Sequence, residues 1–207
     1  MPTSSERLIQ ALYSNARDFG IELRPRDAER LSDYYELLLK WNDKLHLVAP
    51  CSPEKFAMRH ILESLFLLPH LPQNTRVIDI GSGAGLPIVP CLIVRGDLRV
   101  ILIESSQKKS VFLREALRVT NSREPARILT ARFERTNMIE ADFLTCRALD
   151  KFQKLLPTLI EWAPSGSQLL FFAGANLCKQ VKELLPSATV YPIPKSERRF
   201  LISARKI

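Results

Sequence analysis

Metal-ligating residues are scarce in this sequence, which has three histidines and four cysteines among 207 residues. The cysteines form no C-x-x-C pair, and too few histidines accompany them to complete a zinc site. Their scatter also predicts reduced thiols rather than a disulfide framework. We therefore expect a cytoplasmic protein without a metal ion. The four cysteines are Cys51, Cys91, Cys146 and Cys178.

Long apolar runs are also lacking. Residues 1–7 contain no hydrophobic signal core. The longest apolar stretch, from Leu169 to Leu177, covers only about half of a membrane span. We therefore expect no membrane association.

Acidic residues are outnumbered, because 22 Asp and Glu face 30 Lys and Arg and leave a formal net charge of +8. This excess favours a polyanionic partner, since each cation near a phosphate adds salt-dependent affinity. Most basic residues of the stretch 95–135 individually fit a solvated helix face, as Glu115 and Arg118 can pair. As a group they fit a phosphate-binding patch. They are Arg95, Arg99, Lys108, Lys109, Arg114, Arg118, Arg123, Arg127, Arg132 and Arg135.

Glycine is rare as well, and three of the seven glycines stand at every second position, as Gly81, Gly83 and Gly85. They follow a strand predicted over 76–80 and precede a helix predicted over 86–94. Glycine permits positive φ and lets a ligand lie directly on the backbone. The dinucleotide fingerprint requires glycine where Leu86 stands, which argues against a nicotinamide oxidoreductase. The turn instead resembles the D-x-G-x-G-x-G turn of S-adenosylmethionine-dependent (SAM) methyltransferases, with Asp79 as its acid.

Further polar residues follow the next predicted strands. Glu104 ends the strand over 100–103, roughly 20 residues past the glycines, where an acid can accept both ribose hydroxyl protons. Glu134 lies beyond the strand over 126–130, and Arg147 follows the strand over 141–146. Because the carboxyl ends of parallel strands border one crevice, these side chains are expected to lie together.

Alternating elements predict an α/β fold with a mostly parallel seven-stranded sheet and helices on both faces. Three amphipathic helices come first, over 5–19, 25–46 and 52–68, and form an N-terminal extension. The segment 192–196 is too short for a parallel crossover, so the last strand should run antiparallel to its neighbours. We expect one domain over 1–207, with a helical part over 1–72 and a core over 73–207. The remaining predicted elements are a helix from Ser105-Ser106 onward, a helix over 151–162, a strand over 168–172, a helix over 176–185 and strands over 189–191 and 199–203.

Six ordered landmarks between about Tyr35 and Lys206 resemble the bacterial ribosomal RNA small-subunit methyltransferase G family, also named for glucose-inhibited division protein B. The resemblance implies a Rossmann-like methyltransferase fold with SAM as cofactor. It also implies that N7 of a specific guanosine in the 530 loop of 16S ribosomal RNA accepts the methyl group. The partner is then 16S RNA or the small ribosomal subunit, and the protein is expected to be a monomer. The landmarks are Trp41-Asn42, Arg59 to Ser64, Asp79 to Pro87, Glu104 to Leu113, Arg132 to Glu134, and Arg147-Ala148.

The resemblance also assigns site residues. Gly81 and Leu86 contact the methionine end of SAM, Glu104 its ribose, and Phe133 with Glu134 its adenine, while Arg147 lines the methyl-transfer cleft. The full cofactor set is Asp79, Gly81, Gly83, Gly85, Leu86, Glu104, Ser105, Phe133, Glu134 and Arg147. The RNA set is Arg59, His60, Lys108, Lys109, Arg147 and Arg198. No acid or base is assigned, because guanine N7 already carries an exposed lone pair.

Several residues depart from the family pattern, in which Asn-Leu-Thr replaces His46-Leu47-Val48, aspartate replaces Glu63 and glycine replaces Ile88. The family also places a lysine where Ala173 stands, so the charge at this position is missing.

Three alternatives remain from the sequence. A non-catalytic SAM-binding and RNA-binding assembly factor would keep the same fold, and a methyltransferase acting on another RNA base would keep the same cofactor site. Cys146 could act as a nucleophile towards a pyrimidine, although most lone cysteines are buried packing residues. For His60 a hydrogen-bonded structural role is favoured over catalysis.

Overall fold

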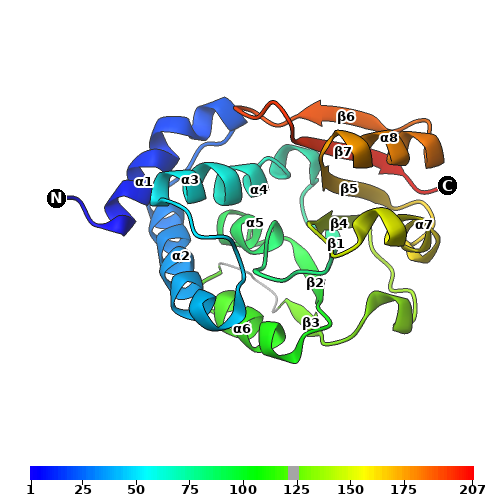
Figure 1. The fold of residues 1–207 in the computed structure, drawn as a ribbon, viewed down its shortest axis with the longest axis horizontal. Coiled ribbons are helices and arrows are strands. Elements are labelled where there is room, and N and C mark those ends of the chain that lie inside the picture. Colours follow the sequence, from blue (N-terminus) through cyan, green and yellow to red (C-terminus); the bar gives the residue numbers. More distant parts are fainter. Residues whose placement is uncertain (121–125) are drawn as a thin grey trace.

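The computed structural model describes residues 1–120 and 126–207. These residues form a seven-stranded sheet with strand order β3-β2-β1-β4-β5-β7-β6 (Figure 1). Neighbouring strands are parallel except β7, which pairs antiparallel with both β5 and β6. This confirms the predicted mostly parallel sheet and the antiparallel final strand. The strands are β1 Arg76–Ile80, β2 Arg99–Ile103, β3 Arg127–Leu129, β4 Phe143–Arg147, β5 Gln168–Ala173, β6 Thr189–Pro192 and β7 Phe200–Arg205.

Four of the helices begin at a side-chain cap or at a proline in the first turn. The Thr3 and Ser52 side chains accept hydrogen bonds from the first-turn amides of Glu6 and Lys55, Pro25 opens α2, and Ser106 caps α6. The α-helices are α1 Ser4–Asn15, α2 Pro25–Leu45, α3 Pro53–Phe56, α4 Glu63–Leu65, α5 Ile88–Val94, α6 Gln107–Leu117, α7 Phe152–Trp162 and α8 Ala175–Leu184. Short 3₁₀ segments are η1 Ala16–Phe19, η3 Leu68–His70 and η4 Phe133–Arg135, and η2 Ala57–Leu62 is π-helical.

Three predicted helices differ from the observed ones. The first changes from α-helix to 3₁₀ helix after Asn15 and ends at Gly20, whose φ is +70°. The helix predicted from position 86 begins only at Ile88. The third predicted helix is interrupted by the π-helical segment η2, in which the amide of Glu63 donates to the carbonyl of Met58. A π-helical turn contains one residue more than an α-helical turn, and the periodicity of the apolar residues does not reveal this insertion.

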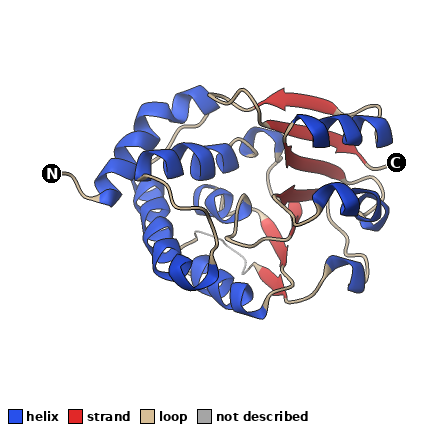
Figure 2. Cartoon of the chain, in the orientation of Figure 1, coloured by secondary structure: helices blue, strands red, loops and turns tan. Residues whose placement is uncertain are grey.

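The sheet has a hydrophobic core on each face, and the strands contribute alternate residues to the two. Val77 and Leu170 pack with α2, α5 and α6, whereas Ile78 and Leu169 pack with α7 and α8. Figure 2 shows the strands running between these groups of helices. Both faces being buried explains why the strands are continuously apolar rather than alternating.

The N-terminal helices share the core of α5 and α6. Leu8, Leu31 and Leu65 belong to the same cluster of buried residues as Leu92 and Phe112. The buried hydroxyl of Tyr34 in α2 also donates to the carbonyl of Ala84 at 2.6 Å. The helical extension therefore packs directly against the turn that follows β1.

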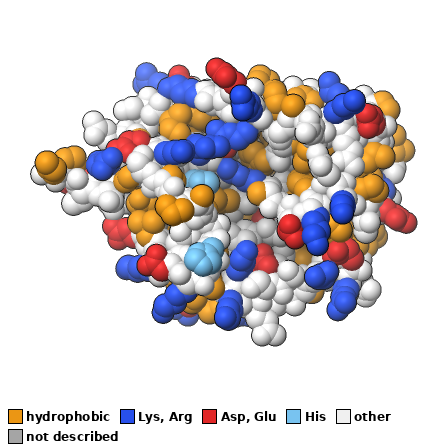
Figure 3. All heavy atoms as spheres, in the orientation of Figure 1, with side chains coloured by type: hydrophobic (Ala, Val, Ile, Leu, Met, Phe, Trp, Pro, Cys, Tyr) orange, Lys and Arg blue, Asp and Glu red, His pale blue; other side chains and the backbone are white. Residues whose placement is uncertain are grey.

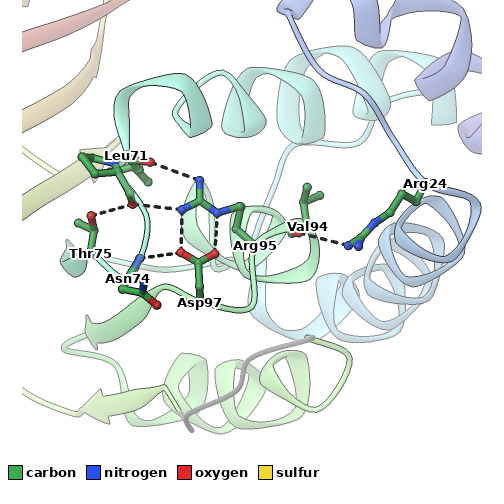
Figure 4. A network of polar contacts seen from close by, with 8 residues as sticks. Arg24, Leu71, Asn74, Thr75, Val94, Arg95 and Asp97 are labelled. Carbon is green, nitrogen blue, oxygen red and sulfur yellow. Dashed lines mark hydrogen bonds and ion pairs between the residues drawn. The ribbon is translucent and has the colours of Figure 1, made fainter.

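An ion-paired network closes the opposite end of α5 (Figure 4). Arg95 binds both carboxylate oxygens of Asp97, at 2.6 and 2.7 Å, and donates to the carbonyls of Leu71 and Pro72. Asp97 also accepts from the amide of Asn74 at 2.8 Å. The network thereby ties the segment that enters β1 to the segment between α5 and β2. The hydrogen bonds from Arg95 lower the pKa of Asp97.

Replacing Asp97 with alanine should reduce the free energy of unfolding by about 2 kcal/mol at pH 7, because charged hydrogen bonds to Arg95 and Asn74 are lost. The pKa of Asp97 is lower in the folded than in the unfolded state, so its contribution is present above about pH 4 and is lost as the pH falls through the folded value. Urea unfolding at pH 7 and pH 3 measures both effects. Asp33→Ala, which removes an exposed acid of α2, should change stability by less than about 0.5 kcal/mol. An equal loss in the two variants would contradict the prediction.

The helices of the structure and the basic stretch 95–135 bear on two expectations from the sequence. Within the described residues, no helix is long and apolar enough to cross a membrane. Arg123 of the basic stretch lies outside the described residues.

Candidate functional site

The site is built on the turn that connects β1 to α5. Gly81, Gly83 and Gly85 all have positive φ, between +53° and +81°. A Cβ atom on Gly81 would lie 2.6 Å from Leu149 Cδ1, and one on Gly85 would lie 2.5 Å from Val89 Cγ2. The turn therefore needs glycine for its conformation and for its close packing, as the sequence pattern predicts.

Glu104 fixes this turn to the end of β2. One carboxylate oxygen accepts from the Gly83 amide at 2.8 Å, and the other accepts from the Ser106 amide at 2.7 Å. The side chain lines a cavity of about 390 Å³ beside the glycines, which we call the glycine-turn cavity. A carboxylate has about four acceptor positions, so two remain for hydroxyl groups of a ligand.

Asp79 lies beneath the turn rather than in a cavity. Its residue is fully buried, and one carboxylate oxygen accepts from the Thr145 hydroxyl at 2.7 Å. The other oxygen has no hydrogen-bond partner within residues 1–120 and 126–207. Burial raises the pKa of Asp79 to about 7. Its position suits support of the turn from below, with no direct exposure to a ligand.

A second cavity, of about 210 Å³, adjoins the first on the side of β3. We call it the Phe133 cavity, and it shares Gly81, Ser105, Leu149 and Asp150 with the glycine-turn cavity. Phe133 is buried and offers a ring beside the exposed Glu134. An apolar ring next to a carboxylate can hold an adenine with its amino group.

A third cavity, of about 380 Å³, opens on the other side of the glycine-turn cavity. It shares His60, Arg147 and Ala148 with that cavity. Four basic side chains line it against a single carboxylate, that of Glu63, so we call it the basic cavity. Figure 3 shows Lys and Arg side chains gathered near a histidine on this face of the molecule. The basic side chains are Lys55, Arg59, Arg147 and Arg199.

Arg147 joins the basic cavity to the π-helical segment. Its guanidinium donates to the Arg59 carbonyl at 2.6 Å, to the Ser64 hydroxyl at 3.3 Å and to the Glu63 carboxylate at 3.1 Å. It also lies over the ring of Phe172, 5.4 Å from the centroid. These contacts hold a side chain that is only 13% exposed. π-helical turns such as η2 are frequent at functional sites.

His60 lies where the basic and glycine-turn cavities meet. Burial, followed by the charges of Arg147 and Arg59, lowers the pKa of His60 to about 3, so the imidazole is neutral at physiological pH. Its buried Nδ1 has no hydrogen-bond partner in the described part of the chain. The hydrogen-bonded structural role favoured from the sequence therefore has no support at Nδ1.

The structure brings most sequence-predicted residues to these cavities, but not all. Lys109 lines the glycine-turn cavity, whereas Lys108 points outward from α6. Arg198 is exposed in a separate groove beside Gly174 and Asn176, and its neighbour Arg199 lines the basic cavity instead. Glu63, noted only as a departure from the family pattern, binds both Arg147 and Arg199. No local signal separates Arg198 from Arg199, because Arg198 lies in a bend and both residues precede β7.

The cysteine alternative is not supported by the geometry. Cys146 is fully buried, and burial raises the pKa of its thiol well above the usual range. A reactive cysteine needs an accessible thiolate. The other three cysteines are also free thiols.

The residues around the glycine turn fit SAM: a backbone cradle that a Cβ would fill, an acid after β2 and a ring after β3. With this strand order they define a class, the SAM-dependent methyltransferases, and SAM is the cofactor. Residues 27–202 match the family model described as rRNA small subunit methyltransferase G. The chain belongs to the rRNA small subunit methyltransferase G family.

Relatives and solved structures agree with this assignment. A Neisseria meningitidis serogroup B protein named ribosomal RNA small subunit methyltransferase G is 34% identical over 96% of this chain and 95% of its own length. One of the same name from Chromobacterium violaceum is 43% identical over 51% of each chain.

Two solved structures share the fold. An RNA methyltransferase from Salinibacter ruber in complex with S-adenosyl-L-homocysteine has a TM-score of 0.52 at 16% identity, over 77% of this chain and 94% of that one. A chain of the fibrillarin/Nop5p complex has a TM-score of 0.55 at 16% identity, over 77% and 87% of the two chains.

Proposed function

We propose that this enzyme transfers the methyl group of SAM to N7 of a specific guanosine in the 530 loop of 16S ribosomal RNA. The observation that carries the proposal is the junction of the glycine-turn cavity with the basic cavity at His60, Arg147 and Ala148. A cofactor methyl group and an RNA base would meet at this junction. The basic lining favours a polyanionic acceptor.

We propose the following division of the cofactor site. The backbone of Gly81, Gly83 and Gly85, with Leu86 and Ser105, would hold the methionine end, and Glu104 would accept from the ribose hydroxyls. Phe133 and Glu134 would bind the adenine. Asp79 would act indirectly, by holding the turn from beneath through its contact with Thr145. The lining of the glycine-turn and Phe133 cavities, which includes these residues except Gly85, Asp79 and Thr145, supports this division.

The chemistry needs little from the protein besides alignment. SAM supplies an activated methyl group when bound, and the lone pair of guanine N7 is free at neutral pH, so no general base is required. Positioning the base at the correct distance and angle can contribute several kcal/mol to the rate. We propose that Arg147 positions this junction and that His60 remains neutral there.

The RNA would approach over the basic cavity. Arg59 and Lys109 line the cavities, and Lys108 lies on the same helix as Lys109. Arg198 borders the neighbouring groove. We propose that these side chains contact RNA phosphates, which would fix the position of the strand without reading its sequence.

We further propose that the chain is one domain, monomeric, cytoplasmic and free of metal. The shared core of the N-terminal helices with α5 and α6 supports a single domain over 1–207. In the described residues, no group of three or more His, Cys, Asp or Glu side chains is arranged to hold a metal ion.

The decisive experiment is transfer of labelled methyl from SAM to small-subunit RNA that lacks its native modification, followed by nucleoside analysis. We expect 7-methylguanosine as the labelled nucleoside, from naked RNA or from assembled particles. Another methylated nucleoside would identify a different acceptor base. Bound SAM in calorimetry with no labelled product would instead indicate a non-catalytic assembly factor.

A further inference from the structure

The basic side chains of the basic cavity are unevenly distributed among the elements that line it. Lys55, Arg59 and Arg147 come from the N-terminal helices and from the end of β4. β5, which lies directly beside β4, and the segments that follow β5 and precede β7 contribute uncharged residues, including Ala173 at the position where the family resemblance expects a lysine. Among the described residues that line the cavity, Arg199 is the cation that these segments contribute. The uncharged residues are Phe172, Ala173, Gly174 and Ile193.

Arg199 is held in place but retains free donors. Its Nη1 lies 2.6 Å from Glu63 Oε1, and its Nε donates to the Ser196 hydroxyl at 3.0 Å. A guanidinium has five N–H donors, and the other three have no protein partner among the described residues. The side chain is 28% exposed, compared with 13% for Arg147. Arg199 is therefore fixed in direction and still accessible.

Glu63 leaves this part of the cavity positive. Its buried carboxylate, 3% exposed, is shared between Arg147 and Arg199. One negative charge cannot neutralise two guanidinium groups, and Arg147 makes three further contacts with the protein. The positive charge that Glu63 does not neutralise is therefore available to a ligand at Arg199. The planar guanidinium group suits the binding of a phosphate group.

We propose that Arg199 binds a phosphate group of the RNA strand beside the target nucleotide and supplies the cation that Ala173 does not. The inference rests on the proposed function. It adds Arg199 to the RNA set expected from the sequence, which includes Arg198 but not Arg199. The two neighbouring arginines face different hollows, so they make separable predictions.

The test compares Arg199→Gln with wild type in binding small ribosomal particles that lack the native modification, at several salt concentrations. We expect about a tenfold loss of affinity, typical of one charge-assisted contact. The slope of log affinity against log salt should also decrease by about one, as one phosphate contact is lost. In methyl transfer, KM for particles should rise about tenfold while kcat at saturating particles stays close to wild type.

Controls separate phosphate binding from a structural effect. Arg205→Gln removes the same charge from an exposed site at the far end of β7 and should leave affinity and salt slope unchanged. Arg199→Lys keeps the charge and should keep the salt slope. SAM affinity by calorimetry should be unaltered in all three variants, because Arg199 does not line the glycine-turn cavity.

Several outcomes would overturn the proposal. These are an unchanged salt slope in Arg199→Gln, an unchanged particle affinity in Arg199→Gln whatever the effect of Arg198→Gln, or a parallel loss of SAM affinity. If the wild-type protein binds particles but transfers no methyl group, the proposed function is refuted. The comparison of particle binding between wild type and Arg199→Gln could still be interpreted. Wild-type protein with no affinity for the particles would overturn both.

Discussion

Arg147→Ala should lower the single-turnover rate of methyl transfer by about 100-fold, because small displacements of reacting groups have effects of this size. The substitution removes the partner of the Arg59 carbonyl and one of the two partners of Glu63. It also removes the cation over Phe172. The π-helical segment and the junction of the two cavities would then lose a common anchor. Thermal unfolding should show a loss of about 3 kcal/mol, since a buried carboxylate loses a charged partner.

A graded series distinguishes charge from geometry at this position. Arg147→Lys keeps the charge but cannot reach the Ser64 hydroxyl, the Glu63 carboxylate and the Arg59 carbonyl together. Its rate should therefore fall between those of wild type and alanine. Rates are measured with saturating SAM and saturating particles, so that binding is excluded. A wild-type rate in Arg147→Ala would rule out the positioning role.

Glu104→Gln should raise the SAM dissociation constant about 30-fold, equivalent to about 2 kcal/mol. The carboxylate accepts from the amides of Gly83 and Ser106, and it would also accept from the ribose. Glutamine has one oxygen, so its amide group must face a backbone N–H donor or a hydroxyl. Either arrangement disturbs the turn as well as the ligand contact.

Calorimetry with SAM measures this change directly. Glu115→Gln makes the same replacement at a partly exposed residue of α6, whose carboxylate pairs with Arg118 in the described part of the chain, and should leave SAM affinity unchanged. Particle affinity without SAM should remain at the wild-type value in Glu104→Gln. Unaltered SAM affinity in Glu104→Gln would show that the acid after β2 does not bind the ribose.

Local sequence patterns predicted most of the elements and the conformation of the glycine turn. The glycines at every second position require positive φ, and the structure has positive φ at all three. Glu104 and Phe133 stand next to strand ends, so the parallel sheet alone brings them to the same edge. When a residue stands directly after a strand of a parallel sheet, its place in the sequence is enough to predict which edge of the sheet it lies on.

The basic cavity was predicted less completely, because its contacts join residues distant in the chain. Glu63 and Arg147 are 84 positions apart, and no local pattern relates them. The same holds for Glu63 and Arg199, so no local pattern pointed to Arg199. Asp79 was assigned to the cofactor site, but its full burial became visible only once β4 and Thr145 were placed beside β1.

By itself, the sequence determined the class of fold, the nucleotide-binding turn, the acid that follows β2 and the preference for a polyanionic partner. These depend on backbone conformation, residue spacing and net charge, which are local or additive properties. The tertiary structure alone decided the π-helical turn, the sharing of Glu63 by two arginines and which of Arg198 and Arg199 lines the basic cavity. Those features arise where β1, β4 and β7 meet the N-terminal helices, and their energies depend on burial and on distances that exist only after the chain has folded.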